Sequence, residues 1–254
     1  MDKSQALYFR DEFRKARARS LADAEDFKEI VFVVESLGMK LAGRQSALGG
    51  AYCSKIVKYA SASPLAEEIP AQHRGFHIPF KALYELVTDG RNDAAHQGAH
   101  ARRLTAYTIE LALVLEDAIM NESLLACDFM ATEPIRAELW HPISFIRQKM
   151  LLNSYSFLPV VDDSDETPSW KLVSDRKLAR YLRRADNSAK RRNILGTELK
   201  QAISDGLCLI SPSICGPKTD IAEIAEKMQD HPWLVVEGQN PGDLLGILTA
   251  FDLL

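Results

Sequence analysis

The stretch GRNDAAHQG, residues 90–98, holds an arginine and a histidine that could carry out chemistry on a phosphodiester. His96 has an unperturbed pKa of about 6.5, so it can take and give protons near neutrality. Arg91 is permanently charged and offers a planar fork to phosphate oxygens. Metal-free RNA cleavage needs proton transfer at the 2′-hydroxyl and at the leaving oxygen, and a cation that stabilises charge on the phosphorus. The two residues therefore form a candidate cleavage site.

The spacing of the pair sets a condition on the backbone. Five residues along an ideal helix turn through about 500°, which leaves the two side chains about 140° apart. The helix can break at Gly90 and again at Gly98, or the site can be assembled across a two-fold axis from two copies of the chain. The alternative is that Arg91 makes surface ion pairs with Asp89 and Asp93, and that His96 is a half-buried structural histidine.

Residues 1–123 read as a helical bundle. Apolar residues recur at three- and four-residue steps in AEDFKEIVFVVESLGMKL and LTAYTIELALVLEDAIM, which predicts two amphipathic helices. Ser20 or Asp23 can cap the first of them, and Gly43 can end it. PFKALYELVTDG predicts a further helix with Pro79 in its first turn, and ALGGAYCSKIVKYAS predicts a shorter one. No segment here alternates as a strand does.

Within this helical context, the arginine–polar–x–x–x–histidine motif before the last helix resembles the HEPN superfamily. Active members of that superfamily are dimeric, metal-independent endoribonucleases with the motif at the subunit interface, and inactive members serve as dimerisation or substrate-binding modules. The resemblance implies that His96 handles protons and Arg91 stabilises the transition state. It also implies that Asn92 orients the phosphate or the histidine.

Residues 124–254 follow a different pattern. FLPVVDD, WKLVS, WLVVEG and LLGIL predict short strands, and ISFIRQKML, RKLARYL and DIAEIAEKMQ predict helices between them. A repeat recurs at an offset of 75 residues, because Pro142, Val161 and Ser174 match Pro217, Val236 and Thr249. The segment RRADNSAKRRN between the copies reads as a polar linker or an exposed helix. The pattern therefore predicts two copies of one small α/β unit.

Both copies resemble the CBS domain, and tandem pairs of that domain form a Bateman module. In that family a strand ending in Gly-apolar-apolar-Ser/Thr, with an aspartate beyond it, holds an adenosine ligand. The second copy contains this run complete, from Gly246 through Thr249 to Asp252. A hydroxyl and the N–H groups at a helix start suit phosphate, and a carboxylate accepts hydrogen bonds from ribose hydroxyls. The alternative is that Thr249 only caps a helix and Asp252 favours its first turn.

The first copy departs from this pattern. Ser174 is present, but Lys171 replaces the glycine and Lys177 replaces the aspartate. A lysine cannot accept hydrogen bonds from a ribose, so we expect Ser174 and Lys177 at most to hold phosphate. Basic residues also crowd residues 176–192, where they form either a solvated helix face or a patch that attracts the phosphates of the ligand or of RNA.

Composition limits the remaining possibilities. The formal net charge of −4 excludes a protein that coats nucleic acid through its overall field. No apolar run approaches the roughly 20 residues of a membrane span, and the charged N-terminus is unlike a signal peptide, so we expect a cytoplasmic protein. The four cysteines form no CxxC pair. The histidines outside the motif have no carboxylate or thiolate neighbours at metal-ligand spacing, so we expect no metal.

The sequence thus predicts an α plus α/β protein with three parts: a HEPN-like bundle at 1–123 and CBS repeats at 124–186 and 187–254. We expect a homodimeric, toxin-like endoribonuclease that uses Arg91, His96 and Asn92 and needs no cofactor for catalysis. An AMP-, ADP- or ATP-like nucleotide bound at Gly246, Thr249, Asp252, Ser174 and Lys177 would regulate it, and an antitoxin or other regulatory protein could bind it. The alternative is a non-catalytic nucleotide sensor whose helical domain dimerises or docks a partner.

Overall fold

A computed structural model describes residues 1–93, 98–121, 123–163, 167–238 and 241–254, with the backbone alone at 92–93 and 98–101. The chain forms two compact units, Met1–Ser123 and Leu124–Leu254. Each unit has its own hydrophobic core. The expected fold class is confirmed: a helical bundle is followed by α/β units with mixed sheets.

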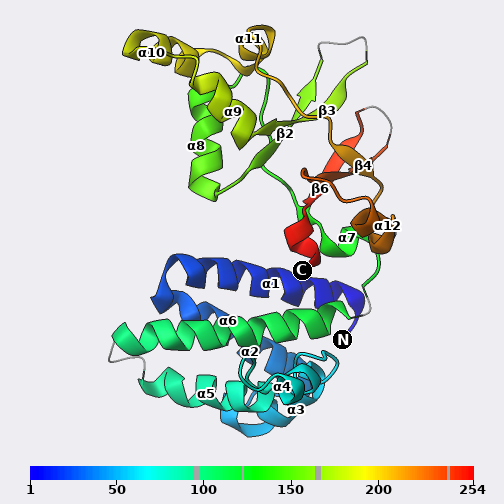
Figure 1. The fold of residues 1–254 in the computed structure, drawn as a ribbon. Coiled ribbons are helices and arrows are strands. Elements are labelled where there is room, and N and C mark those ends of the chain that lie inside the picture. The colour runs from blue at the N-terminus through cyan, green and yellow to red at the C-terminus, as the bar shows by residue number, and fades with distance from the viewer. Residues whose placement is uncertain (94–97, 122, 164–166, 239–240) are drawn as a thin grey trace. The chain divides into compact units, whose positions relative to one another are not determined.

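The described part of the first unit is helical (Figure 1). Helix α6 packs against α1, α2 and α5, and its Leu111 and Leu115 are fully buried in the core. The predicted helices are confirmed, and Gly43 ends α2 in the left-handed conformation. The longer helices are α1 (Lys3–Ala22), α2 (Phe27–Ala42), α5 (Phe80–Asp93) and α6 (Gly98–Met120), and the shorter ones are α3 (Cys53–Ala60), α4 (Glu68–Gln72) and the turns Ala24–Asp26 and Leu48–Tyr52.

The amino-acid pattern of residues 3–22 does not by itself indicate helix α1. Phe9, Phe13 and Ala16 bury one side of it in the core, but charged residues dilute this pattern along the chain. An ion pair also attaches α1 to α6: the guanidinium of Arg17 donates to both carboxylate oxygens of Glu116, at 3.0 and 3.1 Å. The bundle is therefore closed by a helix whose contacts combine apolar packing with a largely buried charge pair.

The described residues of the second unit form two sheets. Strands β2 (Phe157–Asp162) and β3 (Ser169–Ser174) form an antiparallel hairpin. The other sheet has the order β1-β6-β5-β4, with β4 (Ser213–Cys215) parallel to β5 (Trp233–Glu237) and the other neighbours antiparallel. The remaining elements are β1 (Ala131–Thr132), β6 (Asp243–Leu248), α7 (Ala126–Phe129), α8 (Ile143–Asn153), α9 (Asp175–Leu182), α10 (Ser188–Gly196), α11 (Leu199–Ser204), α12 (Ile221–Glu226) and η4 (Ala250–Leu253).

The 75-residue repeat is present in the structure. Helix α8, strands β2 and β3 and helix α9 recur as α12, β5, β6 and η4. Ser174 and Thr249 occupy the same place, each as the residue before the helix that follows the hairpin. The segment between the copies is the exposed helix α10, in which no residue is buried. The expectation of two α/β copies joined by a polar segment is confirmed.

Each repeat pairs with the segment that lies just before the helix of the other repeat. Ala131 of β1 pairs with Ile247 in the second repeat, and Ile210 pairs with Leu172 in the first. Leu172 and Ile247 are themselves equivalent positions of the repeat, 75 residues apart. The two pairings are therefore related by the internal symmetry of the unit.

The start of the second unit is also attached to the second repeat. The amides of Ala126 and Cys127 donate to the carbonyls of Thr219 and Pro217, at 2.8 and 3.0 Å. The amide of Ile221 donates to the carbonyl of Leu124 at 2.8 Å. The residues that follow Ser123 are thus hydrogen-bonded directly to the segment that begins α12.

Candidate functional site

The predicted nucleotide residues of the second repeat lie where β6 turns into η4. The carboxylate oxygen Oδ2 of Asp252 accepts hydrogen bonds from the amide of Thr249 at 2.8 Å and from its hydroxyl at 2.7 Å. The amide of Asp252 in turn donates to the carbonyl of Thr249 at 3.1 Å. The two side chains are thus brought together as a helix cap, which is the arrangement that the structural alternative predicted. A ribose that binds to this carboxylate would compete with the bonds from Thr249.

Gly246 lies three residues before this cap, in the middle of β6. It pairs with Thr132 of β1 on one side and with Val235 of β5 on the other. A Cβ at this position would lie 2.6 Å from the sulfur of Met130 and 2.9 Å from the carbonyl oxygen of Ala131. The close approach of β1 is therefore a structural reason for a glycine here, besides any role toward a ligand.

The first repeat shows the same cap with different side chains. The hydroxyl of Ser174, which is buried, accepts a hydrogen bond from the amide of Lys177 at 3.2 Å. Lys171, in the place of the glycine, donates from its ammonium group to the hydroxyl of Ser211 at 3.0 Å. The contact between Ser174 and Lys177 is therefore made by the backbone amide of Lys177 in the first turn of α9.

Arg91 lies on the last turn of α5. A break of this helix at Gly90 was one of the two possibilities for the motif, and the structure does not have it, because α5 continues from Phe80 to Asp93. A Cβ at Gly90 would come within 3.0 Å of Leu104 Cδ1, so the glycine allows α6 to pack closely against α5. Gly98 is the first residue of α6.

Arg91 is paired with an acid that the sequence analysis did not single out. Its Nη1 lies 2.5 Å from Oε1 of Glu35 on α2, and the two side chains are 40% and 32% exposed. The pair bridges residues 56 positions apart, so no local spacing could have indicated it. Arg91 also lines a cavity of about 150 Å³ with Phe27, Lys28, Val31 and Phe32 of α2.

A buried tyrosine lies near this ion pair. Tyr84 donates from its hydroxyl to the carbonyl of Leu48 at 2.8 Å. Burial, with smaller contributions from Cys53 and Glu35, raises the pKa of Tyr84 above its ordinary value. The phenol therefore stays protonated near neutrality and acts as a hydrogen-bond donor there. Within the motif, the side chain of Asn92 and the whole of His96 lie outside the described residues, so the distance from Arg91 to His96 stays untested.

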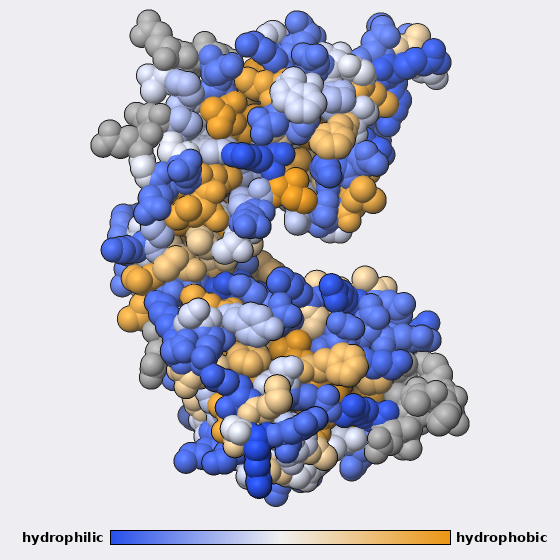
Figure 2. Space-filling view, turned by 180° about the vertical axis from the view of Figure 1, so that it is seen from behind, coloured by the Kyte–Doolittle hydropathy of each residue, from blue (hydrophilic) through white to orange (hydrophobic). Residues whose placement is uncertain are grey.

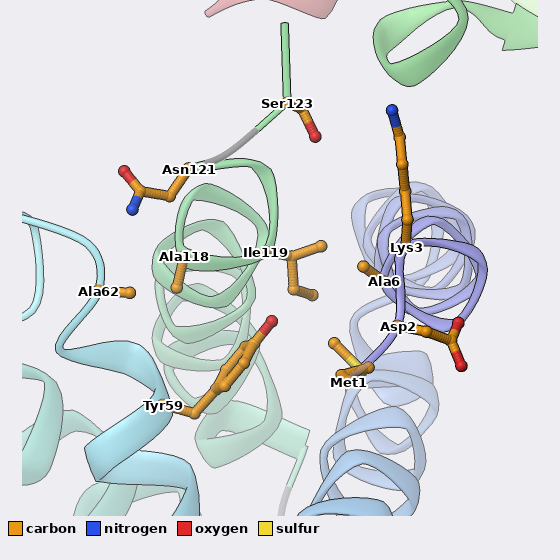
Figure 3. A pocket seen from close by; sticks show the side chains of 10 residues that line it. All are labelled: Met1, Asp2, Lys3, Ala6, Tyr59, Ala62, Ala118, Ile119, Asn121 and Ser123. Atoms are coloured by element: carbon orange, nitrogen blue, oxygen red, sulfur yellow. The ribbon is translucent and has the colours of Figure 1, made fainter.

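A larger cavity of about 300 Å³ lies between the N-terminus of α1 and the C-terminal end of α6 (Figure 3). Tyr59, Ala118 and Ile119 line it opposite Met1 and Ala6. It contains none of the predicted site residues. Among the described residues, no three metal-ligating side chains gather, and no helix has the length and apolarity that a membrane crossing demands.

Comparison with known proteins assigns the end of the chain. Residues 210–254, which include β4, α12, β5, β6 and η4, match the model of the CBS domain family. The second unit therefore contains a C-terminal CBS domain. A search of curated proteins found no match to the chain.

Solved structures with CBS domains also resemble this chain over about half of its length. A CBS domain-containing protein of Bacillus anthracis is 16% identical, with 52% of this chain and 90% of that chain covered and a TM-score of 0.41. CBSX2, solved in complex with AMP, is 20% identical, with 51% and 92% covered and a TM-score of 0.38. A CBS domain protein of Streptococcus pneumoniae is 18% identical, with 49% and 76% covered and a TM-score of 0.37.

Proposed function

We propose that the protein is a nucleotide-sensing regulatory protein. Its second unit binds an adenine nucleotide as a Bateman module, and its helical unit is a dimerisation or partner-docking domain. The observation that carries this proposal is the CBS match at residues 210–254, which ends in the complete run from Gly246 to Asp252. The helical unit has the exposed apolar side chains that such a domain needs, including Phe32, Met39 and Leu86.

The cap geometry supports one mode of binding. Asp252 already accepts hydrogen bonds from a hydroxyl and an amide of Thr249, and in this mode ribose hydroxyls would exchange for these donors. Ribose hydroxyls can donate to a carboxylate, and the N–H groups at a helix start suit phosphate. Because CBSX2 was solved with AMP, AMP is the first nucleotide to test, followed by ADP and ATP.

Calorimetric titration of the full chain with each nucleotide tests this function. We expect one bound nucleotide in each chain, and about 2.7 kcal/mol of added stability at 100 times the Kd. Asp252→Asn should weaken binding at least about tenfold, since the amide loses one acceptor. Asp220→Asn is the matched control, because Asp220 also caps a helix in this repeat, by accepting from the amide of Ala222 at 2.8 Å. Absence of binding by all three nucleotides would contradict the proposal.

A second candidate function is metal-independent RNA cleavage under nucleotide control. The observation that favours it is the position of Arg91: its guanidinium is partly exposed, and it stands directly before Asn92 and the residues that include His96. In this candidate His96 transfers protons, Arg91 stabilises the phosphorane-like transition state, and two copies of the chain share the site. The bond between Arg91 and Glu35 would orient the guanidinium or exchange for a phosphate.

RNA cleavage in EDTA, measured beside Arg91→Ala and His96→Ala, tests this second function. We expect both variants to lose at least about 100-fold in rate while the nucleotide titration stays unchanged. Cleavage that survives both substitutions would come from a contaminant. If the chain binds nucleotide but cleaves no RNA, with or without nucleotide, the second function is contradicted and only the regulatory function remains. Light scattering coupled to gel filtration reports the dimer and any captured partner.

A further inference from the structure

We propose that α9 and α10 form a surface that binds the phosphate backbone of a nucleic acid, independently of the nucleotide site. Residues 175–196 contain eight Lys and Arg residues and two Asp residues, a net charge of +6. The whole chain carries −4, so all the other residues together carry −10. This segment is thus a concentrated basic patch on an acidic protein, which is the form that a local polyanion site takes.

The structure places these charges on the exposed surfaces of two helices that contact each other. Leu178, Tyr181 and Leu182 bury the inner face of α9, and Arg176, Arg180 and Arg183 follow its outer face at steps of four and three residues. Helix α10 contacts α9, buries no residue and adds Lys190, Arg191 and Arg192. In Figure 2 the surface over the projecting α10, at the upper right, is mostly hydrophilic.

Five of these arginines have no acidic partner within the described part of the chain. They are Arg176, Arg180, Arg183, Arg191 and Arg192, and they form none of the ion pairs between described residues. The other basic residues are partly engaged: Lys190 pairs with Asp186 at 2.6 Å, and Arg184 donates to the carbonyls of Asp205 and Gly206 at 2.7 and 3.1 Å. Each of the five guanidiniums can therefore form bidentate hydrogen bonds with a phosphate.

The residues around the patch favour a nucleic-acid backbone over an acidic protein or an anionic membrane as its partner. Residues 175–196 themselves expose no large apolar side chain, so the patch offers no apolar anchor of its own for a protein hot spot. Ile194 and Leu195 pack against the unit's own core, so α10 has no apolar face to insert into a membrane. Tyr181, the only aromatic residue of the segment, is buried and cannot stack on a base. We therefore expect contacts with phosphates only, without sequence preference.

Fluorescence anisotropy of the full chain with a labelled 20-nucleotide oligouridine tests the surface. The ribose 2′-oxygens of the probe are methylated, so that any cleavage is blocked. Five phosphate contacts to a single strand predict a slope of about −3.5 for log K against log salt. The triple variant Arg176→Gln, Arg180→Gln, Arg183→Gln should bind at least about tenfold more weakly at low salt, with a slope near about −1.4. An oligothymidine should behave in the same way, since only phosphates are contacted.

The control variant removes the same charge elsewhere in the unit. Arg136→Gln, Lys218→Gln, Lys227→Gln takes away three exposed cations, and we expect it to change the affinity less than threefold. Circular dichroism establishes that both triple variants are folded. If both triple variants lose the same affinity for the oligonucleotide, the net charge alone causes the effect, and the proposal is overturned. Unchanged binding in the arginine variant, or binding to phosphatidylserine vesicles without binding to either oligonucleotide, would overturn it as well.

Discussion

Gly246 shows at the level of one residue how a single sequence signal can have two causes. The family pattern assigns this glycine to a ligand, and the structure shows the chain of β1 directly against its α-carbon. Met130 can move its flexible side chain, but the carbonyl of Ala131 belongs to a paired strand and cannot move alone. The position therefore requires a glycine even in the absence of nucleotide.

Gly246→Ala is expected to destabilise the second unit by about 1–3 kcal/mol, because the added methyl overpacks the contact with β1. Gly196→Ala is the matched control, since a Cβ at that exposed position meets nothing within 4 Å. The control should change stability by less than about 0.5 kcal/mol. Urea denaturation followed by circular dichroism measures both. Equal stability of the two variants would show that β1 does not press on β6.

Cys215 makes the stability of the second unit depend on pH. Burial, opposed by a hydrogen bond with Thr219, raises the pKa of this thiol from 9.0 to about 11. The unfolded chain therefore loses the proton at lower pH than the folded chain. The stabilisation is complete below pH 9 and is lost as the pH rises through 11, by an amount on the order of 2 kcal/mol.

Urea denaturation of the wild type and of Cys215→Ala at pH 8 and pH 10.5 isolates this contribution. We expect the difference in stability between the two proteins to shrink at the higher pH, because the wild type alone loses the contribution of the thiol. A difference that stays constant would mean that Cys215 is as accessible to water as an ordinary thiol. Cys208→Ser, at an exposed cysteine, serves as the control and should show no such change.

Among the elements, α1 is attached to α6 by a largely buried charge pair in addition to its apolar side. Arg17 and Glu116 are only 18% and 11% exposed, and the guanidinium holds both carboxylate oxygens. Arg14 lies near the same acid, with its Nε 3.9 Å from Oε2. Such a pair contributes little net stability when intact, but removal of one partner leaves a charge that is poorly hydrated.

Glu116→Gln should therefore destabilise the helical unit by about 2–3 kcal/mol. Lys81→Gln is the comparison, because its pair with Glu85 at 4.0 Å is exposed on both sides. That change should cost less than about 0.5 kcal/mol. Thermal denaturation of the full chain reports both effects. A loss for Lys81→Gln as large as that for Glu116→Gln would show that burial does not govern these pairs.

The same elements show what the sequence could and could not predict. Helices α2, α5 and α6 and the paired strands follow from apolar periodicity, which is a local property. Helix α1 was missed because its apolar positions are separated by many charges, and its ion pair joins residues 99 positions apart. The same limit applies to Glu35 beside Arg91 and to β1 beside Gly246. Contacts between distant segments depend on tertiary packing, so the residues that surround a site are less predictable than its motif.

At the scale of the whole molecule, the pairing between repeats limits how the chain can be divided. The second repeat was expected to span residues 187–254, yet its strand β6 is paired with Ala131 and Thr132 of β1. The core around Trp233 and Val235 also includes Ala126 and Met130. A repeat that is cut away from residues 124–132 therefore loses both a strand and part of its core.

We expect a fragment of residues 187–254 to lack a cooperative unfolding transition, whereas residues 124–254 should unfold cooperatively and bind nucleotide as the full chain does. Calorimetry and circular dichroism of the two fragments measure this. A cooperative transition in the shorter fragment would show that β1 and α7 are dispensable. Independent folding of residues 1–123 serves as the control for the cut between the units.

The hydrogen bonds that attach Leu124, Ala126 and Cys127 to residues 217–221 give the two repeats unequal mechanical roles. Strand β6, which ends directly before Thr249, pairs with β1, and β1 and α7 adjoin the point where the chain enters from the helical unit. Under the proposed function, a displacement at Thr249 would reach this point through the second repeat alone. The first repeat, with Lys177 in place of an aspartate, would then not need a ribose acceptor of its own.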